Sequence, residues 1–375
     1  MQFKAEVIGI SKDGSGIVEG PSNKKYFVFG VWPGDKGLFK TNQQKHPNKM
    51  FGYADLIELE CSSKDRVDNP CPYWGTEAGN CQSCSWIFVN YKSQCEQKMK
   101  RLMFSFSKFA DTVLNKINLI ASPQQLGYRN RLSLKTDGKR IGMLSKGTHI
   151  LTPIESCLVA NKHCNTLLKK TWATLPNPSY HPPKKYKFSL IEWDDRSDTI
   201  YLNQKIPFRQ ANTAINEEMK KWIIKNLKII MPNGIVELFC GSGNFTQIIS
   251  DQFQRPILAY EGSKESISQL NKLNLFECKA SVINLFKDLP NIPQGYDTLL
   301  LDPPRLGFKN LEIFIKSNPQ IQDILYISCD SDTLCKDIRS LIKSNWAIKD
   351  VSLMDQFPQT PHFETLVHLQ KTPSK

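Results

Sequence analysis

Apolar and polar residues alternate near the start of the chain in the manner of β-strands. Residues 3–7 alternate strictly, and Tyr26-Phe27-Val28 has the composition of a further strand. The segment Trp32-Pro33-Gly34-Asp35 is typical of a turn. Short strands joined by such turns predict a small β-barrel over residues 1–58, of the OB type or equally of the SH3 type.

Residues 59–205 mix a helical pattern with short strands. We predict a helix from about Tyr91 to Asn118, a strand from Tyr128 to Lys135 and a hairpin from Ser189 to Tyr201. Four prolines between Leu175 and Lys185 predict a loop. This part of the chain is therefore expected to form a small α+β domain.

From residue 206 to residue 375 the pattern changes to strands and helices in alternation. The predicted strands are Ile235–Phe239, Ile257–Tyr260, Thr298–Leu301, Ile324–Ile327, Ile348–Leu353 and Leu366–Leu369. Such alternation is typical of a mostly parallel sheet with helices on both faces. The predicted fold class is α/β, with a Rossmann-like domain at the C-terminal end.

The net charge of +13 is concentrated in under a third of the chain. Residues 96–200 hold 18 Lys and Arg against 8 Asp and Glu, which gives +10 of that total. A local excess of this kind attracts a polyanion, although a solvated basic face without a partner is the alternative. No run of about 18 apolar residues and no secretory signal is present, so we expect a cytoplasmic protein.

A glycine-rich turn follows the first strand of the C-terminal domain. The segment Phe239-Cys240-Gly241-Ser242-Gly243-Asn244 has two glycines, which let the backbone turn tightly and approach a ligand. Glu261 ends the next strand, at a spacing that suits the hydroxyls of an adenosine ribose. The turn lacks the lysine of a phosphate-binding P-loop. We predict an adenosine-containing ligand here, and a generic strand–helix turn is the alternative.

Two more strand ends are expected at the same edge of the sheet, because ligands of open α/β sheets bind beyond the carboxyl ends of the strands. One carries Asp302, which two prolines hold in place, and the other carries Cys329. Asp302 would position a base edge or the cofactor. The structural alternatives are a solvated strand-end Asp302 and a small core residue at Cys329.

Methylation of uracil at C5 needs one thiol and one base. C5 is a poor nucleophile, but a thiolate that adds to C6 creates an enolate that attacks a methyl sulfonium. A base must then remove the C5 proton so that the thiol is expelled. Cys329 and Glu364, just before the last strand, are the candidates, with Cys335 and Cys240 as rival thiols.

Three closely spaced cysteines, Cys71, Cys81 and Cys84, indicate a metal site. Tetrahedral zinc and a [4Fe–4S] cluster both take four ligands, and the residues leave the two open, together with a metal-free loop. The available fourth ligands are Cys61, Cys95, Cys157 and Cys164.

Together these motifs resemble the RNA uridine-C5 methyltransferase family, and within it the bacterial 23S rRNA enzymes that carry an iron–sulfur cluster. The resemblance covers nearly the whole chain. It rests on Phe208-Arg209-Gln210-Ala211-Asn212, the turn from Glu237 to Phe245, Tyr260-Glu261-Gly262, Asp302-Pro303-Pro304-Arg305, Ser328-Cys329 and Glu364.

The resemblance implies a class I methyltransferase that uses S-adenosylmethionine and 23S rRNA, with a TRAM domain over residues 1–58. It implies Cys329 as nucleophile and Glu364 as base, with Asp302 also in the catalytic group. The implied cofactor contacts are Gln210, Phe239, Gly241, Gly243, Asn244, Glu261 and Asp302. A [4Fe–4S] cluster is implied on Cys71, Cys81, Cys84 and Cys157. No protein partner is implied, and we expect a monomer.

The chain departs from the family pattern at two places. Asp330-Ser331 follows the nucleophile where the family usually has Asn-Pro, and the added carboxylate is expected to alter uracil contacts or raise the thiol pKa. The cysteine loop is about four residues longer than the usual C-x5-C-G-G-C, with Gln82-Ser83 in place of the two glycines. Neither change removes a ligand or a catalytic group.

Three other functions stay open at this point, one of which is a redox protein built on the cysteine cluster, weakened by the complete cofactor motif. An amino-group methyltransferase for adenine or glutamine also uses a D/N-P-P corner, but it needs an aromatic residue where Arg305 stands and has no use for Cys329. A non-catalytic RNA-binding protein with a relict fold is the third alternative. The joint presence of Cys329, Glu364, Glu261 and Gln210 argues against it.

Overall fold

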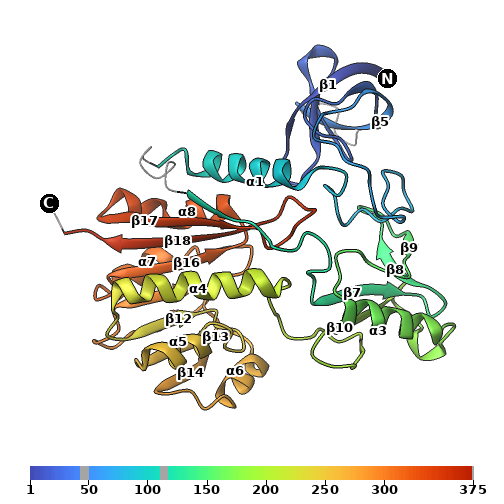
Figure 1. The fold of residues 1–375 in the computed structure, drawn as a ribbon. Coiled ribbons are helices and arrows are strands. Elements are labelled where there is room, and N and C mark those ends of the chain that lie inside the picture. The colour runs from blue at the N-terminus through green and yellow to red at the C-terminus, as the bar shows by residue number, and fades with distance from the viewer. Residues whose placement is uncertain (43–49, 110–116, 374–375) are drawn as a thin grey trace. The chain divides into compact units, whose positions relative to one another are not determined.

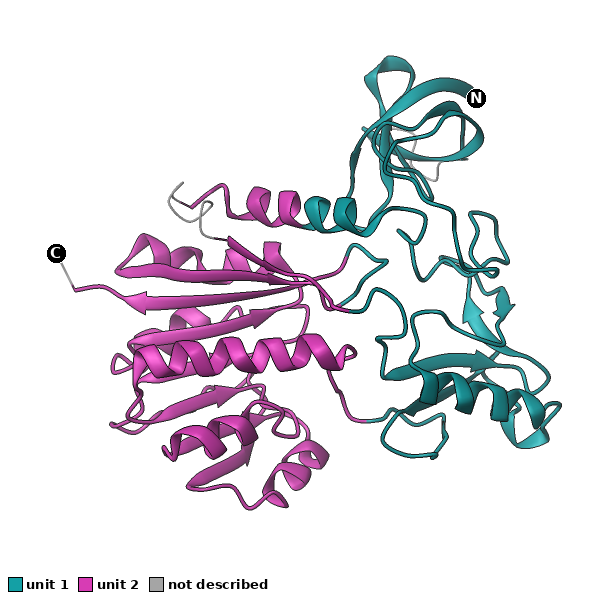
Figure 2. Cartoon of the chain, viewed as in Figure 1, with its two compact units in different colours: residues 1–98, 124–206, 357–361 teal, residues 99–123, 207–356, 362–375 magenta. Residues whose placement is uncertain are grey.

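The computed structural model describes residues 1–42, 50–109 and 117–373. Contacts divide these residues into two compact units (Figure 2). Unit 1 comprises residues 1–98, 124–206 and 357–361, and unit 2 comprises residues 99–123, 207–356 and 362–375. Unit 1 thus holds both the barrel and the central region that the sequence pattern treats as separate domains, and the predicted domain boundaries remain predictions.

The N-terminal part of unit 1 is a closed barrel with strand order β1-β2-β3-β5-β4. Its core contains Phe3, Val7, Val18 and Phe39, which are the inward members of the alternating pattern. A closed five-stranded barrel of this order is an OB arrangement rather than an SH3 one. Residues 43–49 of the predicted barrel lie outside the described residues. The elements are β1 (Gln2–Ile10), β2 (Gly16–Glu19), a short 3-10 helix (Pro21–Asn23), β3 (Lys25–Val28), β4 (Lys36–Thr41) and β5 (Phe51–Cys61).

The rest of unit 1 is built on a five-stranded sheet of order β11-β10-β7-β8-β9. Helix α3 (Lys162–Ala173) begins where the side chain of Asn161 accepts a hydrogen bond from the backbone N–H of Cys164. The predicted hairpin from residue 189 is present as β10 and β11. The strands are β7 (Arg131–Thr136), β8 (Ile141–Leu144), β9 (Leu151–Pro153), β10 (Ser189–Asp194) and β11 (Tyr201–Leu202), and a 3-10 turn covers Pro178–Tyr180.

Unit 2 is an eight-stranded sheet of order β14-β13-β12-β15-β16-β18-β17-β6 (Figure 1). Strands β14, β13, β12, β15 and β16 are parallel, and β18 runs antiparallel beside β16. All six strands predicted for this part are present, which confirms the α/β fold class. They are β12 (Ile235–Leu238), β13 (Ile257–Glu261), β15 (Thr298–Leu301), β16 (Asp323–Ser328), β17 (Trp346–Met354) and β18 (Glu364–Lys371), joined by β14 (Cys278–Val282) and β6 (Ile117–Ile120).

Helices cover both faces of this sheet, and each face has its own apolar core. One core includes Trp222 and Ile249, and the other includes Phe314 and Ile338. The central strands are apolar on both sides because each side is covered. The helices are α1 (Tyr91–Phe106), α4 (Thr213–Ile230), α5 (Thr246–Phe253), α6 (Lys264–Asn271), α7 (Leu311–Ser317) and α8 (Ser331–Lys343). Among the described residues, none of the helices combines the length and the apolar character needed to cross a membrane.

The helix predicted from Tyr91 is shorter at its C-terminal end than the sequence pattern suggested. The helix predicted to reach Asn118 ends at Phe106 in α1, and residues 110–116 lie outside the described residues. Asn118 instead belongs to β6, where it pairs with Ser352 of β17. That pairing is a long-range contact, so the local periodicity that predicted a helix carried no signal of it.

Candidate active site

The reactive side chains of unit 2 are gathered by strand register. Leu238, Leu301 and Tyr326 are paired across β12, β15 and β16, so the residues that follow these strands leave the sheet at one edge. Ser328 pairs with Thr365 across antiparallel strands. The same register continued by one residue places Cys329 opposite Glu364. Two residues far apart in sequence thus meet because β18 begins where β16 ends.

The environment of Cys329 disfavours the thiolate in the absence of substrate. Burial, followed by the negative charges of Glu364 and Asp302, raises the pKa of the Cys329 thiol to about 12. Arg305 acts in the opposite direction, and Asp330 adds a smaller increase. The effect of Asp330 has the sign expected from the sequence, but Asp330 ranks behind burial and the other two carboxylates. The thiol is therefore protonated at neutral pH in the free protein.

Two carboxyl groups act electrostatically on this thiol: Glu364, which is buried, and Asp302, which is half-buried. Burial raises the pKa of Glu364 well above its usual range, and the charge of Asp302 raises it further while Arg305 lowers it. Burial also raises the pKa of Asp302 to about 7. Gln210 Nε2 lies 3.4 Å from Asp302 Oδ2, and Gln356 Nε2 donates to Gln210 Oε1 at 2.8 Å. A chain of two amides therefore orients the Asp302 carboxyl.

The glycine turn after β12 has room for a ligand. Gly241 has φ +56°, and nothing lies within 4 Å of the position where its side chain would begin. Gly243 has φ +94°, and a side chain there would meet Leu270 of α6 at 2.6 Å. Phe239 also has a positive φ of 62°, which is uncommon for a residue with a side chain, and its ring contacts Phe286 and Phe308. The turn is thus strained and close-packed on one side and open on the other.

Glu261 and Asn244 are held by this turn and its neighbours. Glu261 accepts hydrogen bonds from the backbone N–H of Gly241 at 3.2 Å and of Ser263 at 2.9 Å. The side-chain amides of Asn244 and Asn216 pair reciprocally at 3.0 Å and 2.9 Å. Glu261 therefore lies at the open turn, whereas the amide of Asn244 is already used to fasten the turn to α4.

Two residues of this region were missed by the sequence reasoning. Gln356 is buried, and its Oε1 has no hydrogen-bond partner among the described residues. Glu237 is buried in β12, and burial raises its pKa to about 8. An acidic residue inside an apolar strand was a readable signal for Glu237. Gln356 lies in an irregular segment, where only the tertiary contact with Gln210 identifies it.

The four cysteines implied as metal ligands come together in unit 1. Cys71, Cys81, Cys84 and Cys157 line one cavity, whose other walls include Tyr73, Trp74, Leu132, Met143 and Ile154. Burial is the main cause of the raised pKa of the Cys84 thiol, and the other three thiols raise it further. No three His, Cys, Asp or Glu side chains in the described part of the chain are grouped closely enough to hold one metal ion.

The loop that carries these cysteines is fastened by backbone contacts. Cys81 N–H donates to the Tyr73 carbonyl at 2.8 Å, and Cys157 N–H donates to Asn165 Oδ1 at 2.8 Å. Cys164, the rival fourth ligand, is a residue of α3 itself and is fully buried in the apolar core. The structure therefore places Cys157 at the cavity and Cys164 in the core.

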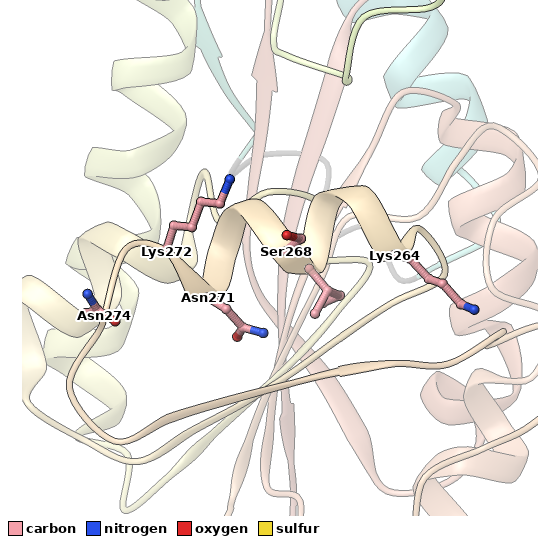
Figure 3. Close-up of a pocket in the computed structure, with 6 residues that line it drawn as sticks. Lys264, Ser268, Asn271, Lys272 and Asn274 are labelled. Atoms are coloured by element: carbon pink, nitrogen blue, oxygen red, sulfur yellow. The ribbon is translucent and has the colours of Figure 1, made fainter.

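A surface hollow lies along α6 of unit 2. Lys264, Ser268, Asn271, Lys272 and Asn274 border it (Figure 3). It is wide open to solvent and contains none of the predicted site residues.

The chain matches the family model described as tRNA (Uracil-5-)-methyltransferase over residues 184–288 and 285–372. It is also 37% identical to an uncharacterized RNA methyltransferase of Nitrosomonas europaea, over 99% of this chain and 97% of that protein. The chain belongs to the tRNA (uracil-5-)-methyltransferase family. The family and the enzyme class expected from the motifs are thereby confirmed.

More distant members of this family and a solved structure agree with this assignment. A 23S rRNA (uracil(1939)-C(5))-methyltransferase of Acinetobacter baylyi is 26% identical over 98% of this chain and 94% of its own length. The structure of Pyrococcus abyssi tRNA (uracil-54, C5)-methyltransferase in complex with S-adenosyl-L-homocysteine has a TM-score of 0.72 at 18% identity. It covers 98% of this chain and 100% of that one, which shows a shared fold.

Proposed function

We propose that this protein transfers a methyl group from S-adenosylmethionine to C5 of a uridine in 23S rRNA, with Cys329 as nucleophile and Glu364 as base. The observation that carries the proposal is the register of β16 and β18, which brings that thiol and that carboxyl together at one edge of the sheet. Glu364 is buried and Cys329 is half-buried, and Asp302 and Arg305 act electrostatically on both. An amino-group methyltransferase would have no role for this pair.

The chemistry begins when the Cys329 thiol releases its proton to solvent and reacts as the thiolate. Its sulfur forms a bond to C6 of the target uracil, and the electrons of the C5=C6 double bond move to the C4 oxygen as an enolate. The electrons return through C5, which forms its bond to the methyl group as the methyl–sulfonium bond breaks. The Glu364 carboxylate then takes the C5 proton, the double bond re-forms and Cys329 leaves as thiolate. A target base within a stacked helix must be flipped out to reach this thiol.

S-adenosylmethionine supplies the electrophilic methyl group when it is bound. The open side of Gly241 fits a close approach of the ligand to the backbone, and the Glu261 carboxylate at this turn suits the ribose hydroxyls. The chain Gln356–Gln210–Asp302 offers buried polar groups to the reactive end. We propose Phe239 and Gly243 as shape-defining residues of this turn. Asn244, whose amide is taken by Asn216, fits a role through its backbone.

The cysteine cavity fits a [4Fe–4S] cluster on Cys71, Cys81, Cys84 and Cys157. Four thiols without other donor types are soft ligands, which suit iron–sulfur clusters or zinc. Zinc and a [4Fe–4S] cluster each take four thiolates, and the resemblance to the cluster-bearing enzymes favours the cluster. When bound, the cluster would cross-link the loop, and no step of methyl transfer depends on it.

The relatives support ribosomal RNA as the substrate. The Acinetobacter baylyi protein and a 24% identical one of Mannheimia succiniciproducens are named as 23S rRNA enzymes, and each match spans nearly the full length of both chains. The OB-type barrel would serve as the TRAM domain, and residues 96–200 supply the positive charge that RNA attracts. With this substrate the protein would act in the cytoplasm, as a monomer.

Trapping with 5-fluorouridine tests the function directly. The protein is incubated with 5-fluorouridine-substituted 23S rRNA and S-adenosylmethionine, and a denaturation-resistant adduct is mapped by mass spectrometry. Fluorine at C5 cannot leave as a proton, so the methylated base stays bonded to the nucleophile. We expect the adduct on Cys329. Cofactor binding without an adduct on any RNA would contradict the proposal, and an adduct with tRNA but not with rRNA would change the substrate.

A further inference from the structure

The turn that carries Cys329 is short and is held partly by its own polar residues, because Ser328 Oγ accepts from the Asp330 backbone N–H at 3.2 Å. It is the two-residue link between Ser328, the last residue of β16, and Ser331, the first residue of α8. Asp330 caps α8, because its Oδ1 accepts from the backbone N–H of Asp332 and of Thr333, each at 3.1 Å. Proline at the first helical position would add a rigid ring to this backbone, and Ser331 instead supplies a hydroxyl that can form a hydrogen bond.

A side chain from a distant part of the sequence is bonded to this turn. Ser105 of α1 lies 226 positions before Ser331, and their two Oγ atoms are 3.0 Å apart. Ser105 Oγ also donates to Asp332 Oδ1 at 2.8 Å. The Arg101 carbonyl, 3.2 Å from Ser105 Oγ, is a second acceptor, but the Asp332 carboxylate is nearer and charged. Each hydroxyl has one proton, so the favoured arrangement is Ser331 donating to Ser105 and Ser105 donating to Asp332. Both serines are buried, at 7% and 1% exposure, so water does not compete for these bonds.

Arg101, one helical turn before Ser105, packs against the residue that precedes the proposed catalytic base Glu364. Its guanidinium lies 5.4 Å from the centre of the Phe363 ring, and Phe363 directly precedes Glu364. The same guanidinium is attracted to the carboxylates of Asp332 and Asp330. One helix therefore touches the turn that carries the thiol and the residue beside the base.

We propose that Ser105 is a positioning residue for methyl transfer, because its hydroxyl holds Ser331 and Asp332 and so fixes the turn that presents Cys329. This inference rests on the proposed function of Cys329. Ser105 touches neither substrate nor cofactor in this scheme, and Arg101 assists by holding the same helix against Phe363. A loosened turn spreads the thiol over positions that do not reach C6, which lowers kcat and leaves cofactor binding unchanged.

The test compares Ser105→Ala with Ser107→Ala, a matched control. Ser107 is exposed, and its hydroxyl donates to the nearby Phe104 carbonyl at 2.8 Å. Iodoacetamide labelling of Cys329, followed by peptide mass spectrometry without RNA, reports how well the turn is held. We expect Ser105→Ala to raise the labelling rate several-fold and to lower kcat about tenfold, the loss expected for one buried hydrogen bond. KM for S-adenosylmethionine and both readouts of Ser107→Ala should stay at wild-type values.

Ser331→Pro separates positioning from general stability. The backbone of Asp330, with φ −141° and ψ 102°, is already extended, as a residue before proline must be. If Ser105 acts by stiffening the turn, Ser105→Ala should cost less than twofold in kcat in the Ser331→Pro background. An equal loss in both backgrounds, or unchanged labelling in Ser105→Ala, would overturn the inference. Failure of the proposed function would give a different result. The wild-type protein would form no adduct with 5-fluorouridine RNA, while Ser105→Ala would still change the labelling rate of Cys329.

Discussion

In unit 2 the reactive side chains stand at the ends of strands, whereas in unit 1 the four cavity thiols are carried by loops. Cys329 and Glu364 meet because two antiparallel strands share one register, and many ladder bonds define their places. Cys71, Cys81 and Cys84 depend on a few backbone bonds within a loop. A site of the first kind is preorganised before any ligand binds, and a site of the second kind gains its order from the ligand. The consequences of substitution should therefore differ between the two.

The largest effect is expected at the nucleophile. Cys329→Ala should lower kcat by on the order of a hundred-thousandfold and abolish the 5-fluorouridine adduct, with the Kd for S-adenosylmethionine unchanged. Rates from single-turnover methylation and Kd from calorimetry measure the two parts. Cys335→Ala, a buried thiol on α8, is the control and should affect packing alone. An adduct that moves to Cys335 or Cys240 would show that the strand-end geometry was wrongly interpreted.

Glu364→Gln should slow turnover by about a hundredfold to ten-thousandfold. Because the C5 proton then has no acceptor, the methylated adduct should accumulate on ordinary uridine-containing RNA, which mass spectrometry detects without fluorine. Burial raises the pKa of Glu364, so the wild-type rate should rise with pH, and the variant should lose that dependence. Glu312→Gln, on the exposed face of α7, should behave as wild type. Fast turnover of the Gln variant would assign the base elsewhere.

Cys84→Ala should act on stability rather than on chemistry. We expect loss of bound iron, measured by absorbance and iron analysis, and a free energy of unfolding lower by about 3 kcal/mol in thermal or urea denaturation. The affinity of unit 2 for S-adenosylmethionine should stay the same. Cys61→Ala is the matched control, since Cys61 is exposed and lies outside the cavity. If both variants keep their iron, the cavity that contains Cys84 does not bind the cluster.

The smallest effect is a change in the pH dependence of stability. Asp302 has its pKa raised by burial to about 7 from 3.8, so the folded protein holds this proton more tightly than the unfolded chain does. That contribution to stability is complete below pH 3.8 and is lost as pH rises through 7. Asp302→Asn should therefore raise the free energy of unfolding by about 1–2 kcal/mol at pH 8 and remove most activity.

Melting curves at pH 5 and pH 8 measure this difference. Asp251→Asn, at an exposed position of α5, provides the control and should leave the pH dependence unaltered. An Asp302→Asn protein with the wild-type pH profile would indicate that this carboxyl is not buried in solution.

The residues that could be predicted are those whose signal is local. The apolar runs of β12, β15 and β16 are visible in the sequence, and so are the Gly-x-Gly turn and the polar residues that end the strands. The sequence could not decide between Cys157 and Cys164 as fourth ligand, because both lie near the start of α3. They differ only in their tertiary surroundings, since Cys157 lines the cavity and Cys164 lies in the apolar core. Gln356 was missed for the same reason, since its role depends on a contact with Gln210, 146 positions away.

The sequence by itself determined which strands form, which residues end them, and which chemistry a thiol, a base and a glycine turn together support. These properties follow from side-chain periodicity and residue type, which act over a few neighbouring positions. The tertiary structure alone decided that Asn118 lies in a strand, that Cys329 faces Glu364, and that Ser105 reaches the nucleophile turn. Such pairings depend on strand register and on packing between segments far apart in the chain, and their energy appears only once the whole sheet has formed.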